Sequence, residues 1–385
     1  MATRNIATPI TAHRQRGAAL LILLTIILLA ASYTLLKRLN REPVEILRTA
    51  DSVRVLGEAR DALVGYALSA NPPGLLPCPD YGSDGNYDGL SDPCVEAGSS
   101  VTAGRLPWQT LGLADPRDSA GERLWYSPAK ELDGNYIINS ETTAGLRVDG
   151  NAAQVAAVII APGATLDNQS RPPNFAAQDD PTRYLEDANS IADNNFVSAP
   201  TGAAVDFNDQ LAVIYRDDLL QGVERRVLAE LKGYLSQYYA TNGYYPYPAA
   251  LNTSDCSTLQ TQGHLPEPAK SGDCGALAEW DPGLPSWFSS QGWNRLVWYA
   301  PAPACTQASP GCSGSGFIEV LNTTAPTDDK QAVLIAVGPA LAGQSRPAAS
   351  ESDLFESIEN GNGDAVFEKL PIDGSRNDQI LVVAP

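Results

Sequence analysis

The feature that most constrains the fold of this chain is an internal repeat. Residues 157–172 read AVIIAPGATLDNQSRP and residues 332–347 read AVLIAVGPALAGQSRP, so ten of the sixteen positions are identical without a gap. Further matching blocks follow in the same order, namely 63–68 with 231–236, 74–79 with 243–248, 124–129 with 297–302 and 208–214 with 377–383. Ordered blocks of this kind indicate a duplicated structural unit. We therefore expect two homologous domains, over residues 48–217 and 218–385.

The pattern within each unit predicts an α+β domain. An amphipathic helix is expected over residues 219–240, and the first unit begins with apolar residues at helical spacing from Val44 to Leu68. Short β-prone runs follow a loop rich in glycine and proline, and they lie at 123–126, 156–161, 210–214, 296–299, 317–321, 332–336 and 379–383. This order predicts a helix packed on an antiparallel sheet in each unit.

A long apolar segment precedes the repeats. Residues Ala18 to Leu36 carry no charge, and a helix of that length just spans the hydrocarbon core of a bilayer. All six cysteines lie beyond residue 77, which favours an oxidising compartment for that part of the chain. We expect a single-pass inner-membrane protein whose membrane helix and its extension cover 18–47. The domains would then be periplasmic, or extracellular within a filament.

The junction before the apolar segment carries a family resemblance. Residues 14–22 read RQRGAALLI, a basic polar leader that ends in Gly17 directly against apolar residues. This arrangement resembles the class III signals of type IV pilins and type II secretion pseudopilins. The resemblance implies that a prepilin peptidase removes residues 1–17 and that Ala18 becomes the methylated amino terminus. An ordinary secretory signal, cut near Ala30 to Ser32, is the alternative.

Two further details bear on the place of the chain within that family. Most pilins carry Glu at the fifth mature position, whereas this chain has Ile22 there. In the family the absence of this Glu is associated with a tip subunit. Residues 241–251 and 291–302 are similar in part to the major-pseudopilin pattern of a helix ending in NG-Y-P and a later aromatic strand. The resemblance implies a long amino-terminal membrane-spanning helix followed by two pilin-like domains.

The sharpest chemical motif is DGNYDGLSD, over residues 84–92. Its spacing matches the opening of an EF-hand-type calcium loop, in which alternate oxygen-bearing side chains point to a common centre. The candidate ligands of Ca²⁺ are Asp84, Asn86, Asp88, the carbonyl of Leu90, Asp92 and Glu96. Glu96 comes one position later than the usual bidentate Glu. A polar loop of turn-forming residues that binds no metal is the alternative.

The cysteines predict disulfides. Cys78 and Cys94 bracket the candidate calcium loop, so a bridge between them would restrain its ligands. The second unit holds the other four, Cys256, Cys274, Cys305 and Cys312. Their connectivity does not follow from sequence, and pairing in sequential order is the simplest arrangement. Zinc is a weak alternative because no CxxC motif is present.

The sequence predicts no enzyme. A classical triad needs a His or an equivalent base, and His264 lies in the loop-like run GHLPEP. No G-x-S-x-G, phosphate-binding glycine loop or HExxH motif is present. The chain has 26 basic and 45 acidic residues, a formal net charge of −19. Such a surface repels phosphate backbones, which argues against nucleic acid as a partner.

These observations predict a structural function. We expect a minor pilin or pseudopilin that initiates, caps or decorates a type IV pilus or type II secretion filament. Its partners would be other pilin or pseudopilin subunits, the inner membrane and the prepilin peptidase. The alternative is a membrane-tethered adhesin that binds carbohydrate or a surface through aromatic residues. The candidates for that face are Tyr238, Tyr239, Tyr244, Tyr245, Tyr247, Trp280, Trp287, Trp293 and Trp298.

Overall fold

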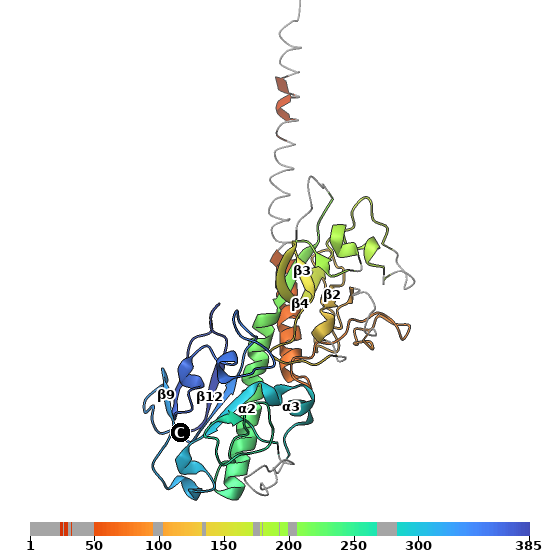
Figure 1. Cartoon of the computed structure of the whole chain (residues 1–385). Helices are drawn as coiled ribbons and strands as arrows, with labels where there is room; N and C mark the ends of the chain where they lie inside the picture. Colours follow the sequence, from red (N-terminus) through yellow and green to blue (C-terminus); the bar gives the residue numbers. More distant parts are fainter. Residues whose placement is uncertain are drawn as a thin grey trace, which may run out of the picture. The chain divides into compact units, whose positions relative to one another are not determined.

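The apolar run in the middle of each repeat forms the central strand of a sheet in the computed structural model of the chain (Figure 1). Strand β4 covers Asn151–Ala161 and is buried without interruption from Val155 to Ala161. Strand β10 covers Ala332–Ala336 and is buried along its whole length. Continuous apolar runs of this kind are typical of strands covered on both faces, which explains why these two segments lie deepest in the fold.

The chain divides into two units, Met1–Ser52 and Val53–Pro385. The structure describes residues 24, 25, 27–29, 32, 50–94, 103–132, 136–171, 178, 180–191, 193–198, 206–267 and 283–385. In the first unit the described residues between 24 and 32 are helical and exposed. Both copies of the sequence repeat belong to the second unit, so the boundary expected near residue 217 stays a prediction.

The first sheet has the strand order β1-β2-β4-β3-β5, and β6 also pairs with β4. The strands other than β4 are β1 (Gly104–Arg105), β2 (Trp125–Pro128), β3 (Leu146–Val148), β5 (Asn195–Phe196) and β6 (Gln210–Tyr215). A helix over residues 53–69 packs on this sheet. Its buried side chains are Val55, Leu56, Ala59, Leu63 and Ala67, and they share one apolar core with β2 and β4.

The second sheet has the order β12-β10-β8-β7, and a small parallel pair, β9 with β11, lies outside it. The strands of this sheet other than β10 are β7 (Gly263–His264), β8 (Val297–Pro301) and β12 (Gln379–Ala384). The separate pair consists of β9 (Glu319–Leu321) and β11 (Val366–Glu368). Helix α2 (Arg216–Asn242) packs on β10 and β12, and the short α3 covers Ser286–Ser290. Single 3-10 turns are η1 (Lys130–Leu132), η3 (Pro181–Arg183), η4 (Asp187–Ser190), η6 (Trp293–Arg295), η7 (Pro303–Cys305), η8 (Pro310–Cys312), η9 (Glu351–Asp353) and η10 (Ile358–Asn360).

Helix α2 is longer than the 219–240 expected from the sequence. It begins directly after β6, with Asp217 and Asp218 in its first turn, where carboxylates interact favourably with the helix dipole. It ends at Asn242, and the next residue, Gly243, has a φ of 76°, the left-handed conformation common after a helix. The two ends therefore follow from local chemistry that periodicity alone does not register.

The two sheets share strand register around their central strands. The pairs are Trp125↔Ile160 and Tyr126↔Ile159 in the first, and Trp298↔Ile335 and Tyr299↔Leu334 in the second. In each sheet the buried tyrosine donates its hydroxyl hydrogen bond to a proline carbonyl at 3.1 Å, from Tyr126 to Pro77 and from Tyr299 to Pro246. The strongest sequence blocks, 157–172 and 332–347, thus begin in corresponding central strands.

Direct contacts join the two halves of the second unit. The Asn139 side chain donates to the Gln291 carbonyl at 2.8 Å, and the Ile138 amide donates to the Gln291 side chain at 2.6 Å. Helix α2 also passes close to the helix over residues 53–69. A Cβ atom added at Gly222 would lie 2.8 Å from Leu68 Cδ2, so a larger residue at 222 would have to displace the Leu68 side chain.

The fold class expected from the sequence needs one correction. The described part is α+β with helices on sheets, but it contains no helix long and apolar enough to cross a membrane. The expectation concerned residues 18–47, most of which lie outside the described residues.

Candidate functional site

The predicted calcium loop is organised by hydrogen bonds between its own residues. Asp84 Oδ1 accepts from the Asn86 amide at 2.8 Å, and Asp88 Oδ1 accepts from the Leu90 amide at 2.9 Å. Asp92 accepts from the backbone amides of residues 81 and 83 at 2.6 and 3.1 Å. Three of the five described candidate ligands thus use carboxylate oxygens as local turn acceptors, the role that Asp commonly has in turns.

Asp80 precedes this loop, is hydrogen-bonded to it, and was not among the candidate ligands. Its side chain is buried and accepts from the amides of Gly82 at 3.1 Å and Gly89 at 2.8 Å. Burial raises the pKa of Asp80, and the nearby carboxylates of Asp92 and Asp88 raise it further. Asp80 therefore holds the loop through two backbone amides. Its carboxyl group interacts electrostatically with those of Asp88 and Asp92.

Gly89 has a steric role in addition to its role in the turn. Its φ is 86°, and an added Cβ would lie 2.2 Å from Trp108 Nε1, so no other residue fits here without displacing the indole. Among the described residues no group of three or more His, Cys, Asp or Glu side chains is placed to hold a metal ion. Glu96 lies outside the described residues. Calcium binding at this loop stays a prediction.

Two of the expected disulfides are present. Cys78 pairs with Cys94 and Cys305 pairs with Cys312. Cys256 is also disulfide-bonded, whereas Cys274 lies outside the described residues. Paired cysteines are typical of an oxidising compartment outside the cytoplasm.

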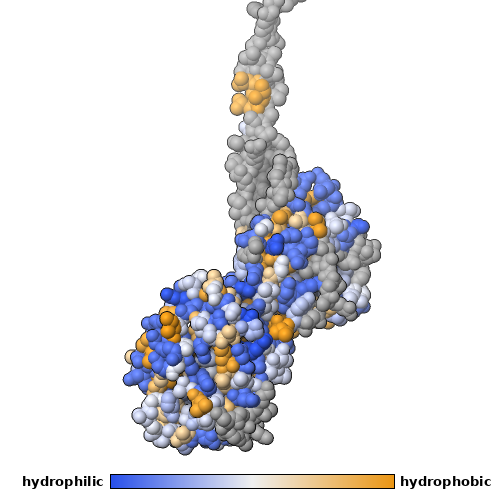
Figure 2. Space-filling model, in the orientation of Figure 1, coloured by the Kyte–Doolittle hydropathy of each residue, from blue (hydrophilic) through white to orange (hydrophobic). Residues whose placement is uncertain are grey.

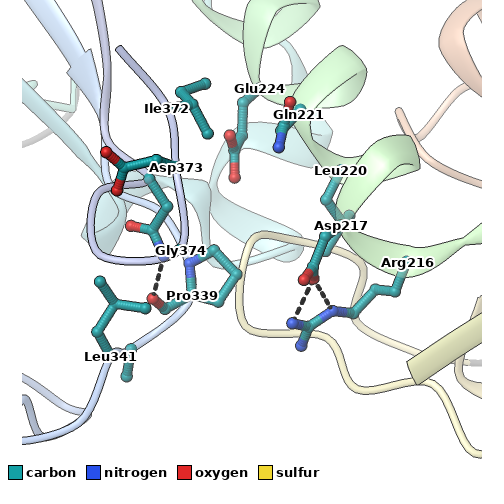
Figure 3. Close-up of a pocket in the computed structure, with 12 residues that line it drawn as sticks. Arg216, Asp217, Leu220, Gln221, Glu224, Pro339, Leu341, Ile372, Asp373 and Gly374 are labelled. Carbon is teal, nitrogen blue, oxygen red and sulfur yellow. Dashed lines mark hydrogen bonds and ion pairs between the residues drawn. The ribbon is translucent and has the colours of Figure 1, made fainter. Parts of the chain in front are cut away.

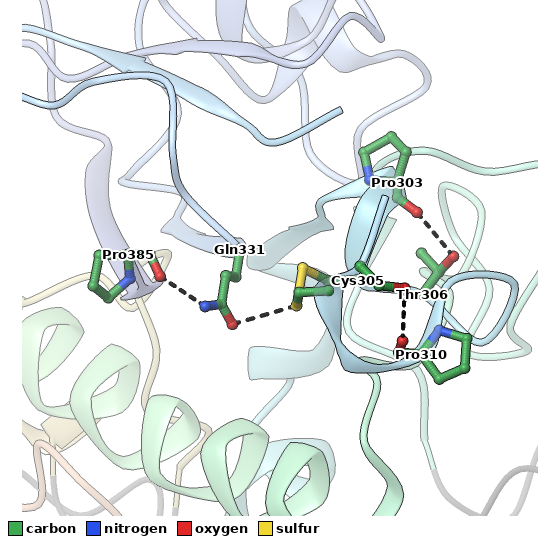
Figure 4. Close-up of a disulfide and its surroundings, with 8 residues drawn as sticks. Pro303, Cys305, Thr306, Pro310, Gln331 and Pro385 are labelled. Atoms are coloured by element: carbon green, nitrogen blue, oxygen red, sulfur yellow. Dashed lines mark hydrogen bonds between the residues drawn. A yellow bond between two sulfur atoms is a disulfide. The ribbon is translucent and has the colours of Figure 1, made fainter. Parts of the chain in front are cut away.

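The second bridge holds a loop against the carboxyl end of α2. The Gly311 amide donates to the Gly243 carbonyl at 2.6 Å, and the Tyr245 amide donates to the Cys305 carbonyl at 2.8 Å. Gln331 lies beside the bridge and donates to the Pro385 carbonyl at 2.7 Å, which ties the last residue of the chain to the same region (Figure 4).

The aromatic residues proposed for a binding face are mostly in the core. Those that are buried are Tyr238, Tyr245, Trp287, Trp293 and Trp298, and Trp280 lies outside the described residues. They pack with β8 and β10, as aromatic side chains commonly do beneath a helix. On the face shown in Figure 2, apolar residues lie in small groups among hydrophilic ones. The geometry therefore does not favour an aromatic platform.

His264 is a core residue of strand β7. It is 2 % exposed and lies edge-on to Trp298, with ring centroids 5.1 Å apart. Burial lowers the pKa of His264 to about 4, so the ring is neutral at physiological pH. A neutral imidazole packed on an indole is a structural arrangement, and no hydrogen bond from a described nucleophile reaches either ring nitrogen.

The most extensive polar site in the first half surrounds Glu186. Its Oε2 accepts from the amides of Asn208 and Asp209, each at 3.0 Å. Its Oε1 accepts from the Gln169 side chain at 2.5 Å. Gln169 in turn accepts from the Leu166 amide, so one buried carboxylate fixes the loop after β4 and the start of β6 together.

The second half repeats this site around Glu356. Its Oε2 accepts from the amides of Asn377 at 3.2 Å and Asp378 at 3.4 Å, and its Oε1 accepts from Gln344 at 3.2 Å. The asparagine amides make a further matching contact, with Asn208 donating to the Ala164 carbonyl and Asn377 to the Pro339 carbonyl, both at 2.7 Å. We call these two groups the paired carboxyl clusters: Gln169, Glu186, Asn208 and Asp209, and Gln344, Glu356, Asn377 and Asp378.

In each cluster one of two neighbouring carboxyl groups has a raised pKa. Burial raises the pKa of Asp209 to about 8, and the neighbouring Glu186 carboxylate adds to the effect. The pKa of Asp378 is raised well above its ordinary value by burial and by Glu356. Two adjacent carboxyl groups in a low-dielectric site cannot both ionise without a large electrostatic penalty.

A signal for these clusters was present in the sequence. The Gln-Ser-Arg run at 169–171 recurs at 344–346, and the Asn-Asp pair at 208–209 recurs at 377–378. Polar residues that stay identical between copies while their neighbours change indicate a polar framework within the repeat. Glu186 and Glu356 lie outside every matched block, so only the structure brings them to these sites.

The carboxyl groups of the two clusters hold neighbouring loops in place. Their carboxylates accept from backbone amides, and no described cation lies in ion-pair distance of Glu186, Asp209, Glu356 or Asp378. No family model, curated protein or solved structure matches the chain.

Proposed function

We propose that the protein is a pilin-like structural subunit, a minor pilin or pseudopilin that initiates, caps or decorates a type IV pilus or type II secretion filament outside the cytoplasm. The observation that carries the proposal is a framework that occurs twice, in which a helix packs on a mainly antiparallel sheet and a paired carboxyl cluster fixes the loop after the central strand. The leader resemblance at residues 14–22 supports the same reading.

The use of the ionisable groups supports a structural subunit. The Arg171 guanidinium donates to the Gly163 carbonyl at 2.7 Å and pairs with Glu122 at 3.1 Å. Arg346 pairs with Glu141 at 3.1 Å. These charged groups fix a loop and a contact between the two halves, and so they make the fold rigid. A subunit of an ordered assembly requires such a rigid fold.

The edge strands β6 and β12 carry contacts that disfavour pairing with a strand of another molecule. Strands β6 and β12 each pair with one described strand, and such edges attract unwanted strand pairing. In both halves a helix cation contacts the edge, from Arg60 Nε to the Val213 carbonyl at 3.4 Å and from Lys232 Nζ to the Val382 carbonyl at 3.1 Å. These contacts favour association through side-chain surfaces over edge-to-edge pairing.

The proposal is tested in the native host. Filaments sheared from cells are analysed by mass spectrometry for this chain and for its amino terminus. We expect the chain in the filament fraction with Ala18 as its first residue, and Gly17→Val to retain the leader and leave the filaments. Ala7→Val, a substitution elsewhere in the leader, is the matched control and should be processed normally. A mature terminus at Met1 or near Tyr33, or a chain absent from every filament preparation, would overturn the proposal.

A further inference from the structure

A cavity of about 440 Å³ is lined by α2, by the loop after β11 and by the start of β12. Its apolar side chains come from all three segments and are those of Leu228, Leu370, Ile372, Ile380 and Leu381. Leu228 and Ile380 belong to the buried core, whereas the other three are half-buried. Sites for small ligands are mostly apolar and span roughly 300–1,000 Å³. The cavity therefore has the size and the lining of a small-molecule site.

Two cations line the same cavity, which we call the basic cavity. They are Arg225 on α2 and Lys369 in the loop after β11, and both are exposed. Neither side chain forms a hydrogen bond or an ion pair with a residue that the structure describes. The chain has 45 acidic and only 26 basic residues, so two cations without an acidic partner are unusual here. Their presence at one cavity favours a ligand of negative charge.

The acidic groups near the basic cavity do not neutralise these cations. Asp378 also lines the cavity, but one of its oxygens accepts from a backbone amide at 3.1 Å and its side chain is hydrogen-bonded to Glu356. Burial raises the pKa of Asp378 well above its ordinary value, which favours the neutral acid. The charge of Arg225 lowers the pKa of Glu224, but burial outweighs this effect and raises that pKa to about 8. Both cations therefore remain available to a ligand.

A neighbouring cavity has lining charges of the opposite sign (Figure 3). It shares Ile372 with the basic cavity, has a volume of about 190 Å³ and is lined by Asp217, Glu224 and Asp373. The only cation of its described lining, Arg216, is paired with Asp217 at 2.5 Å. An anion would therefore enter the larger of the two cavities, where the cations are not paired.

The rest of the lining limits the kind of anion. The amide nitrogen of Gln379 donates to the Gln221 carbonyl at 2.9 Å and to Glu224 at 2.5 Å, so this donor is already used. A peptide would have to bury its backbone amides against the apolar walls, which is costly. A carboxylate on an unbranched chain brings a single polar group for the guanidinium and the ammonium, and a chain that the apolar walls can cover.

We propose that the basic cavity binds a monocarboxylic acid with an unbranched apolar chain. Arg225 and Lys369 bind the carboxylate, and the leucine and isoleucine side chains of the lining cover the chain. This is a ligand-binding function in addition to the structural one proposed above, and it does not depend on assembly into a filament.

Isothermal titration of the purified full chain with sodium hexanoate tests the proposal. Saturable binding is expected, and it should tighten by about three- to fourfold for each methylene added from butyrate to hexanoate, because each methylene adds apolar surface that is buried. Hexan-1-ol keeps the chain without the charge, and acetate keeps the charge without the chain. Each should bind at least about tenfold more weakly than hexanoate. Absence of saturable hexanoate binding, or equal binding of either control, would overturn the proposal.

A double variant tests the two cations. Arg225→Gln combined with Lys369→Gln removes both charges at exposed positions and should weaken hexanoate binding by at least about tenfold, because the charge-assisted hydrogen bonds are lost. Arg376→Gln removes an exposed cation of the same loop outside the cavity, so it is the matched control and should bind as the wild type does. Urea midpoints of the variants check that the fold is kept. Equal binding by the double variant and the wild type would overturn the assignment.

Leu370→Trp tests the apolar wall while both cations stay in place. The larger side chain occupies space in the cavity, so hexanoate binding should again fall by at least about tenfold. Unchanged binding would show that the wall takes no part and would overturn the proposal. A blocked Glu-Leu dipeptide presents the same chemistry on a peptide backbone. Tighter binding of the dipeptide than of hexanoate would assign the cavity to a partner protein and overturn the assignment to a free acid.

Discussion

The two halves of the folded unit cover a buried tryptophan of the sheet with different residues. In the first half Arg105 lies over Trp125 and Tyr184, with its guanidinium carbon 4.0 and 4.3 Å from the ring centroids. In the second half His264 occupies the corresponding strand position against Trp298. Both residues cover the indole of the neighbouring strand, but one is a cation and the other a neutral ring. The same backbone framework therefore accepts two kinds of buried polar group.

The reason for the difference lies in the surroundings of each residue. Arg105 donates to the carbonyls of Gln178 and Arg123 at 3.1 and 3.2 Å, so its charge is hydrogen-bonded as well as stacked. Burial still lowers the pKa of Arg105, to about 10. His264 instead lies in a cavity that is also lined by Arg295, Arg346 and Glu141, where burial and the nearby Arg295 both disfavour a charged imidazole. Replication of a fold thus keeps the shape of a site more strictly than its charge.

A second difference concerns the arginine of each Gln-Ser-Arg run. Arg171 forms its ion pair with Glu122 inside its own half, whereas Arg346 pairs with Glu141 of the other half. The arginine of the first half therefore makes its ion pair within that half. The equivalent arginine of the second half makes a contact between the two halves.

We expect the largest change in stability when Arg105 and His264 are each replaced by the residue of the other half. His264→Arg places a third guanidinium beside Arg295 and Arg346, where the Glu141 carboxylate of the same cavity already pairs with Arg346, and we expect the free energy of unfolding to fall by about 3–5 kcal/mol. Arg105→His loses stacking and two hydrogen bonds but adds no buried charge, so a smaller loss of about 1–2 kcal/mol is expected. Urea denaturation of the two variants measures the contrast. Equal losses would show that the two sites are interchangeable.

An intermediate effect concerns the paired carboxyl clusters. The pKa of Asp209 rises from 3.8 to about 8 in the folded state. The folded chain therefore holds a proton that the unfolded chain releases. This contribution is fully present below pH 3.8 and is lost as the pH rises through about 8. Asp209→Asn keeps a neutral group at every pH, so it should raise stability at pH 9 by about 1–3 kcal/mol relative to the wild type.

The measurement is the urea midpoint at pH 5, 7 and 9. Asp378→Asn makes the same change in the second half and should act in the same direction, which sharpens the likeness between the copies. Asp206→Asn, at an exposed position, is the control and should leave the pH profile unchanged. A wild-type profile that Asp209→Asn does not flatten would show that the cluster ionises without penalty.

The smallest expected effect separates the halves. We predict that Ca²⁺ stabilises the loop at 84–92 by about 1.4 kcal/mol at a tenfold excess over Kd, because a ligand that binds only the folded state shifts the equilibrium by mass action. Hydrogen exchange of the full chain should show slower exchange in the first half alone. Asp84→Ala combined with Asp88→Ala should abolish the effect, whereas Glu359→Ala combined with Asp364→Ala, in the acidic turn of the second half, should not. An unchanged melting temperature in millimolar calcium would show that the loop is a polar turn that binds no calcium.

The sequence alone determined the parts of this protein that depend on local pattern. The runs at 156–161 and 332–336 are apolar without interruption, so they predict buried strands, and these are the cores of β4 and β10. The periodicity at 219–240 predicts most of α2, since an amphipathic helix repeats its signal over several turns. Two disulfides follow from sequential pairing.

Only the tertiary structure decided the groups that depend on distant residues. Strands β1 and β7 are two residues long and have no local signal, yet they place Arg105 and His264 on their tryptophans. Glu186 meets Asp209, and Glu224 meets Gln379, across long stretches of chain. The membrane helix expected at 18–47 is absent from the described part of the chain. Periodicity reports what one segment needs to bury, whereas a polar site depends on which segments the fold brings together, and that depends on the packing of the whole unit.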